Sequence, residues 1–134
     1  MTITKGIVFT KDQIIDLYNN VGWSSYLENK NELWKAIENS LASYSMLLNN
    51  RIMGYARILG DGITTIIIQD LLIRTEYQGK GRGSELLRYI LEEYKNIRQI
   101  YVICDDQAYL NQFYEKNGFI EIQKYKERCY AIFH

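Results

Sequence analysis

The chain has 134 residues, a length that fits one domain built around one hydrophobic core. Hydrophobic residues make up 47% of it, too many for a disordered chain, and 16 Lys and Arg balance 16 Asp and Glu. This neutral balance lacks the basic field that nucleic-acid binding normally needs, so no nucleic-acid partner is expected.

The chain shows no sign of export, membrane insertion or metal binding. Its N-terminus has no long apolar segment, and no apolar run approaches the roughly 20 residues that span a bilayer. We therefore expect a cytoplasmic protein without a membrane partner. Cys104 and Cys129 lie in apolar, strand-like runs, which indicates buried free thiols, although a disulfide stays open. With His134 as the single histidine, they make no metal site, so no metal is expected.

Hydrophobic periodicity predicts an alternation of strands and helices. The first strand is predicted over Ile3–Phe9, followed by a helix that Thr10 or Asp12 caps and that ends near Gly22. A second helix is predicted with Asn31 as its cap. Its apolar face is formed by Leu33, Trp34, Ile37 and Leu41.

The rest of the chain continues this alternation and predicts a single α/β domain over residues 1–134. Turns are expected at 49–51 and 61–62, and Gly118 is expected to end a helix in the left-handed conformation. The predicted elements, in order, are strands Ser43–Leu48, Ile52–Leu59 and Ile63–Ile73, a helix over 86–94, strand Gln99–Cys104, helix Tyr109–Asn117, and strands Phe119–Tyr125 and Arg128–Phe133.

A glycine-rich stretch, QGKGRGS, joins the third of these strands to the helix that follows. Gly79, Gly81 and Gly83 let the backbone approach a ligand closely, and the helix start offers N–H groups and positive charge to an anion. Lys80 and Arg82 add charge at the same place. The stretch fits neither the GxxxxGK[ST] nor the GxGxxG pattern, so a phosphate loop of another kind and a merely flexible cationic turn are the alternatives.

The frame Q-x-x-G-x-G, formed by Gln78, Gly81 and Gly83, resembles the pyrophosphate loop of the GCN5-related N-acetyltransferase (GNAT) family. The segments DLLIRTEYQGKG (70–81), MGYAR (53–57) and FYEKNGF (113–119) also resemble motifs of this family, in the family's order and spacing. The resemblance implies a mixed, mostly antiparallel central sheet with flanking helices. A β-bulge would splay the strand before the loop away from its neighbour.

The resemblance also implies acetyl-CoA as co-substrate. The loop backbone would bind its pyrophosphate, main-chain groups at Leu72 and Ile73 would pair with the pantetheine arm, and the gap between the strands 63–73 and 99–104 would hold the thioester. The implied loop residues are Gln78, Gly79, Lys80, Gly81, Arg82, Gly83 and Ser84. Thr75 stands where the family usually has Pro. Gln107 stands where an Asn often helps to bind the pantetheine, which leaves its contact with the cofactor in doubt.

Acetyl transfer to an amine needs an acid for the leaving thiolate and benefits from a base for the amine. By the resemblance, Tyr114 matches the family position whose phenol lies near the CoA sulfur. A phenol is protonated at neutral pH and can therefore donate its proton; the alternative role of Tyr114 is core packing. Asp70 is the candidate base, since burial in an apolar strand would raise the pKa of its carboxyl; its alternative role is structural. Gln69 alternates with Asp70, so only one of the two is expected to face the pocket.

Trp23 and Tyr26 follow the first predicted helix and are candidates for the wall that binds a flat or cationic amine, the alternative being that Trp23 covers the sheet. The sequence is similar to a bacterial and plastid subgroup of GNAT proteins related to arylalkylamine acetyltransferases. The predicted function is therefore acetyl transfer to a small primary amine by direct attack in a ternary complex. Alternatives are a protein lysine or N-terminal acetyltransferase and a non-catalytic acyl-CoA sensor. The oligomeric state is open between monomer and homodimer.

Overall fold

The computed structural model describes all 134 residues and divides them into two compact units, Met1–Ile103 and Cys104–His134. The first unit contains one five-stranded sheet, whose spatial order β1-β2-β3-β4-β5 follows the chain. The first three pairings are antiparallel and the β4–β5 pairing is parallel, which confirms the predicted mixed, mostly antiparallel sheet. The strands are β1 (Thr2–Lys5), β2 (Ala42–Leu48), β3 (Arg51–Gly60), β4 (Thr65–Ile73) and β5 (Gln99–Val102).

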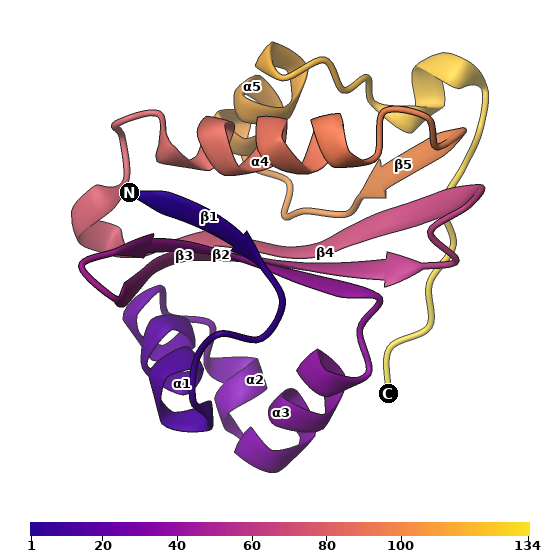
Figure 1. Ribbon diagram of the computed structural model, residues 1–134. Helices are drawn as coiled ribbons and strands as arrows, with labels where there is room; N and C mark the ends of the chain where they lie inside the picture. Colours follow the sequence, from indigo (N-terminus) through magenta and orange to yellow (C-terminus); the bar gives the residue numbers. More distant parts are fainter. The chain divides into compact units, whose positions relative to one another are not determined.

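Helices cover both faces of this sheet (Figure 1). One face carries α1 (Lys11–Asn20), α2 (Ser24–Leu27) and α3 (Lys30–Glu38), and the other carries α4 (Arg82–Glu93), as the predicted flanking helices require. No helix combines the length and the apolarity that crossing a membrane demands. The core on the α1–α3 side is a cluster of buried residues, Phe9, Ile14, Leu17, Tyr18, Leu33, Ile37, Ile52, Tyr55 and Leu72.

The N-terminal strand is shorter than predicted, because β1 ends at Lys5 and not at Phe9. Gly6 adopts a φ of 112°, which turns the chain away after its N–H has bonded to the Ser43 carbonyl at 2.8 Å. Phe9 instead packs into the core just before α1. Thr10 is the cap of that helix, as predicted, and forms a reciprocal capping box with Gln13.

The predicted cap of the second long helix is wrong by two residues. Asn29 is extended, with φ −138°, and its side chain accepts the Glu32 N–H at 3.1 Å, so α3 begins at Lys30 and Asn31 lies inside its first turn. The helix ends at Glu38, which leaves Leu41 outside it and 43% exposed. The short helix α2 lies between the two predicted helices and was not among the predicted elements.

A β-bulge interrupts the pairing of β3 with β4, and it controls which face each side chain of β4 occupies. Arg57 pairs with Asp70, but the next residue, Ile58, pairs with Ile68, so Gln69 has no partner on β3. Paired residues share a face and consecutive residues alternate, so the extra residue puts Ile68 and Asp70 on opposite faces. Asp70 therefore joins the α1 side of the sheet while Ile68 lies on the α4 side.

The second unit contains α5 (Ala108–Lys116) and the 3₁₀ helix η2 (Ile122–Tyr125). Gly118, with φ 92°, follows the helix in the left-handed region, as predicted. The two strands predicted after it are wrong. The first range contains η2, which is followed by Lys126 in the left-handed region with φ 61°. Residues 128–133 make no ladder hydrogen bonds, without which an alternating apolar pattern forms no strand.

The two cysteines are exposed free thiols, so the expectation that they are buried is wrong. Cys104 lies two residues beyond the end of β5, and Cys129 lies in the C-terminal segment that forms no strand. The first apolar run therefore continues past the end of β5, and the second forms no strand that could bury its cysteine.

Candidate active site

The glycine loop has the geometry of an anion-binding turn at a helix start. Gly79 and Gly81 have φ values of 74° and 78°, and a Cβ placed on either would meet no atom within 4 Å. Gly81 is also the N-cap of α4 and offers no side chain to cap the helix. Open space therefore borders the positive end of a twelve-residue helix, at a backbone that only glycine adopts without strain.

Side chains fix the approach to this loop and modify its charge. Gln78 Nε2 donates to the Ile73 carbonyl at 2.9 Å, so this side chain folds the loop back on the end of β4. Lys80 is exposed, and its ammonium donates to the Glu76 carbonyl at 3.4 Å. Arg82 pairs with Glu85 at 3.1 Å one turn further along α4. The loop thus has two cations, the exposed ammonium of Lys80 and the guanidinium of Arg82. A bound anion would share Arg82 with the carboxylate of Glu85.

The strand that leads into the loop is open on one side. The parallel pairing of β4 with β5 covers Thr65–Ile68 and stops where the bulge begins. From Asp70 to Ile73, β4 still pairs with β3 but has no strand partner on its other edge. The splay that the resemblance implied is therefore present. Main-chain groups near Leu72 and Ile73 lie in the splayed stretch, and the Ile73 carbonyl already accepts the Gln78 bond.

Asp70, the candidate base, is buried with both carboxylate oxygens occupied. Oδ2 accepts the Tyr18 hydroxyl at 2.7 Å and Arg57 Nε at 2.8 Å, and Oδ1 accepts the Tyr26 hydroxyl at 2.9 Å. The side chains of Asp70 and Arg57 are 2% and 7% exposed, so the pair is shielded from solvent. A carboxylate with three donors and a paired guanidinium is arranged as an anchor between the sheet, α1 and α2, which favours the structural alternative.

Electrostatics around this anchor follow from the same contacts. Burial lowers the pKa of Arg57 and the Asp70 carboxylate raises it, with a net upward shift that keeps the guanidinium charged. Burial, reinforced by Asp70, raises the pKa of both Tyr18 and Tyr26, so both phenols stay protonated donors. Arg57 and Tyr18 were not among the predicted site residues, although Arg57 lies in the MGYAR segment.

The two acceptor-side candidates form a stacked pair. The Trp23 and Tyr26 rings lie 6.2 Å apart at 29°, and the Arg57 guanidinium lies 5.9 Å from the Tyr26 ring. Tyr26 is half-buried: its hydroxyl donates to the buried Asp70, and its side chain remains partly accessible to solvent. Trp23 packs against the α1–α3 core from its edge. The pair therefore offers an aromatic surface, and both rings also pack against the α1–α3 core.

The remaining candidates lie in the second unit. Tyr114 on α5 packs between Phe113 and Phe119, with ring centroids 5.0 and 5.5 Å away, and its hydroxyl makes no hydrogen bond within the protein. Burial, reinforced by Cys104, raises the pKa of Tyr114 to about 12. Gln107 is the N-cap of α5, but its side chain does not cap the helix.

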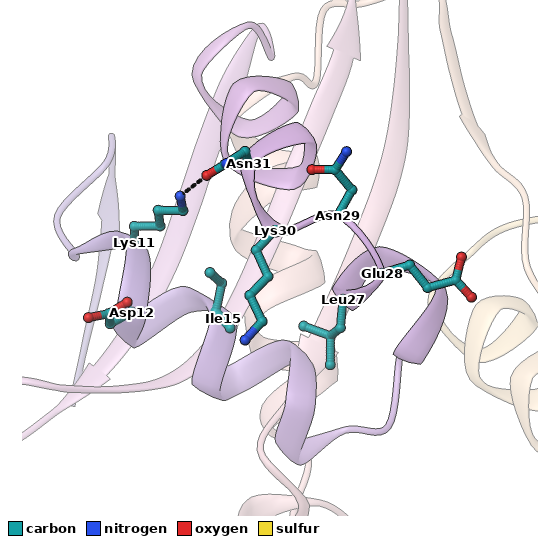
Figure 2. A pocket seen from close by; sticks show the side chains of 8 residues that line it. All are labelled: Lys11, Asp12, Ile15, Leu27, Glu28, Asn29, Lys30 and Asn31. Atoms are coloured by element: carbon teal, nitrogen blue, oxygen red, sulfur yellow. Dashed lines mark hydrogen bonds between the residues drawn. The ribbon is translucent and has the colours of Figure 1, made fainter.

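The first unit also has a hollow of about 480 Å³ between α1, α2 and α3 (Figure 2). Lys11 Nζ on α1 donates to Asn31 Oδ1 on α3 across it. Acidic and basic side chains both line the hollow, whose lining residues are Lys11, Asp12, Ile15, Leu27, Glu28, Asn29, Lys30 and Asn31. None of the predicted site residues lines this hollow, so it does not contribute to the candidate site.

The motifs and the splayed sheet agree with a comparison to known families. A family model described as an acetyltransferase (GNAT) domain matches residues 8–133. The chain belongs to the GNAT acetyltransferase family. This GNAT chain is 30% identical over 113 residues to an uncharacterized ycf52-like N-acetyltransferase from the cyanobacterium Prochlorococcus marinus. That match covers 80% of the chain but 61% of the relative, so the chain spans about three fifths of the length of the curated relatives it matches.

Solved structures share the GNAT fold. An acetyltransferase of the GNAT family from Streptococcus pneumoniae superposes with a TM-score of 0.86 and 27% identity, covering 99% of this chain and 97% of that one. An aminoglycoside 6'-N-acetyltransferase, solved in complex with coenzyme A, gives a TM-score of 0.71 at 18% identity and covers 88% of this chain and 84% of its own. The second likeness shows the fold alone.

Proposed function

We propose that this chain transfers an acetyl group from acetyl-CoA to a primary amine of a small molecule, by direct attack within a ternary complex. The glycine loop is the observation that carries the proposal, because its left-handed glycines border open space at the uncapped start of α4. The family model spans residues of both units, which supports one acetyltransferase domain over residues 1–134.

The residues of the loop suit the pyrophosphate of CoA. Backbone N–H groups at the first turn of α4, the ammonium of Lys80 and the guanidinium of Arg82 supply donors and positive charge. The free edge of β4 beside Leu72 and Ile73 suits an extended arm with amide groups, which would bond there as a strand does. The coenzyme A bound to the aminoglycoside acetyltransferase is a further support from a protein of the same fold.

The chemistry requires the amine nitrogen to form a bond to the thioester carbonyl carbon while the carbon–sulfur bond breaks. Acetyl-CoA supplies the activated acyl group. We propose Tyr114 as the acid that protonates the departing thiolate, since its raised pKa keeps the phenol protonated. The amine must lose one proton, and Asp70 is the base candidate on the splayed strand. Because Asp70 is buried and already accepts three hydrogen bonds, we propose solvent as the route for that proton and Asp70 as the anchor of Tyr26.

Trp23 and Tyr26 are proposed to bind the acceptor. Their stacked rings offer an apolar, π-rich surface on which an aromatic or cationic amine would rest. This assignment agrees with the resemblance to arylalkylamine acetyltransferases and points to arylalkylamines and polyamines as the first substrates to test.

Calorimetric titration with CoA tests the cofactor loop. Gly81→Glu fills and charges the open space, and we expect it to abolish binding while the fold is retained. Gly22→Glu is the matched control, because Gly22 has the same φ of 78° and equally open surroundings, so it carries the same backbone strain. Equal CoA affinity in the two folded variants would remove the loop from the proposal.

A thiol-release assay over a panel of amines tests the transfer itself. We expect release of CoA with an arylalkylamine or a polyamine and none without acceptor. CoA binding without release on any small amine, but with release on peptides, would reassign the acceptor to protein. Binding with no release on either would indicate an acyl-CoA sensor, and absence of binding would contradict the proposal as a whole.

A further inference from the structure

Two side chains of α1 reach the end of β4. Asp16 and Asn20 are four residues apart, so they lie on one face of the helix. Asp16 Oδ2 pairs with the Arg74 guanidinium at 2.8 Å, and Asn20 Oδ1 accepts the main-chain N–H of Thr75, also at 2.8 Å. Helix α1 therefore contacts two consecutive residues, Arg74 and Thr75, that are distant from it in sequence.

Arg74, which forms the ion pair with Asp16, is only 3% exposed. Its Nε donates to the Ile52 carbonyl of β3 at 3.1 Å, and its main-chain N–H donates to the Met53 carbonyl at 2.7 Å. A charged side chain this buried requires its partners, because an unpaired guanidinium is costly away from water. Arg74, the residue that follows β4, thus joins β3 to α1.

Arg74 and Thr75, the two residues that α1 contacts, lead directly into the glycine loop. Thr75 opens η1 (Thr75–Tyr77), and its carbonyl accepts the Gln78 N–H at 3.3 Å, one residue before Gly79. β5 covers β4 only up to Ile68, so the stretch before Thr75 is held by β3 alone among the strands. Contacts from α1 therefore supply the additional restraint where the sheet is open.

We propose that Arg74 and Asn20 are positioning residues for the CoA loop, with α1 acting as a strap that holds the loop's entry in its binding conformation. The inference rests on the proposed function, because the loop must bind CoA for its entry to matter. The strap acts before the chemical step, so its loss weakens CoA binding and raises the KM for acetyl-CoA, while kcat at saturating acetyl-CoA stays within about twofold.

The test compares the same change at two neighbouring asparagines. Asn20→Leu removes the acceptor of the Thr75 N–H, whereas Asn19→Leu alters an exposed side chain that makes no hydrogen bond. We expect Asn20→Leu to raise the CoA Kd about fivefold, the equivalent of one lost hydrogen bond, and Asn19→Leu to leave it unchanged. Asn20→Asp keeps an acceptor oxygen and should restore affinity at about 0.3 M salt, where its added charge is screened.

Hydrogen exchange at the Thr75 amide gives a readout that needs no ligand, and it should accelerate in Asn20→Leu only. Equal Kd values in the two leucine variants would overturn the inference. If Asn20→Leu does not fold, Asp16→Ala decides, since Asp16 is 62% exposed; an unchanged Kd in that variant would also overturn it. Absence of CoA binding by the unaltered chain would instead remove the proposed function.

Discussion

Asp70 illustrates how a single buried carboxylate is assigned by its partners. Two phenols and one guanidinium converge on its oxygens, from three different elements, at 2.7 to 2.9 Å. A general base needs a free lone pair directed at the reacting amine, and three of the roughly four lone-pair sites of this buried carboxylate already accept donors. The contacts therefore support an anchoring role, in which Asp70 orients Tyr26 for the acceptor.

Asp70→Asn distinguishes the two roles. The change removes the charge that compensates buried Arg57, so we expect the free energy of unfolding to fall by about 3 kcal/mol, as for other broken buried ion pairs. Turnover should drop, but the pH–rate profile of the folded fraction should keep the acidic limb of the unaltered enzyme. Loss of that limb would establish Asp70 as the base.

Tyr114, unlike Asp70, is proposed to take part in the proton transfer, because its hydroxyl has no hydrogen-bond partner within the protein. With its pKa raised to about 12, the phenol stays protonated over the range in which the acceptor amine loses its proton. We therefore expect kcat/KM to rise with pH and to show no descending limb below about pH 10, the ordinary phenol value.

Tyr114→Phe should lower kcat about 100-fold, within the range of lost general acids, and change acetyl-CoA affinity less than twofold. Tyr109→Phe on the same helix is the control, since Tyr109 is 64% exposed. Equal turnover in both variants would return Tyr114 to aromatic packing with Phe113 and Phe119.

At the scale of elements, the bulge at Gln69 separates a regular sheet from an open one. On its N-terminal side β4 pairs with both neighbours, and on its C-terminal side it pairs with β3 alone. The sequence predicted the splay only through the family resemblance. Hydrophobic alternation offered no trace of it, because both faces are covered by helices and the even-numbered residues of β4 are buried before and after the bulge.

Deleting Gln69 tests whether the bulge serves the site. Without this residue Ile68 and Asp70 become consecutive and alternate normally, so each keeps its partner, Ile58 or Arg57, on β3. We expect the deletion variant to fold with unchanged or higher thermal stability and to extend the β4–β5 ladder. Hydrogen exchange over 70–72 should slow and CoA affinity should fall. A folded variant that binds CoA as before would show that the open edge is dispensable.

The elements that the sequence predicted best are those with a local cause. Thr10 and Gln13 form a capping box from side chains three residues apart, and the glycine turn follows from residues that tolerate positive φ. The errors in strands and in the site contacts occurred where a distant partner decides. The C-terminal strands had the alternation but no strand to pair with, and the Arg57–Asp70 contact depends on a register that a single extra residue shifts.

At the scale of the whole first unit, buried tyrosines tie stability to alkaline pH. Tyr18, Tyr44 and Tyr55 are fully buried, and burial, as the largest cause, raises the pKa of each above the usual value of 10. Below pH 10 the phenols are protonated in both states and this stabilisation is complete. Above pH 10 the unfolded chain loses these protons and the folded chain keeps them, so the equilibrium shifts toward unfolding.

Each such group contributes a slope of about 1.4 kcal/mol per pH unit, so these three lower the free energy of unfolding by about 4 kcal/mol per pH unit above pH 10. Tyr26 and Tyr114, whose pKa values burial also raises, add to this slope. Urea titrations followed by circular dichroism at several alkaline pH values measure this slope. Tyr55→Phe should reduce it by about 1.4 kcal/mol per pH unit, whereas Tyr130→Phe, at a residue 85% exposed, should leave it unchanged. Equal slopes in the two variants would mean that the phenol of Tyr55 ionises in the folded protein as readily as in the unfolded chain, and that its burial does not control alkaline stability.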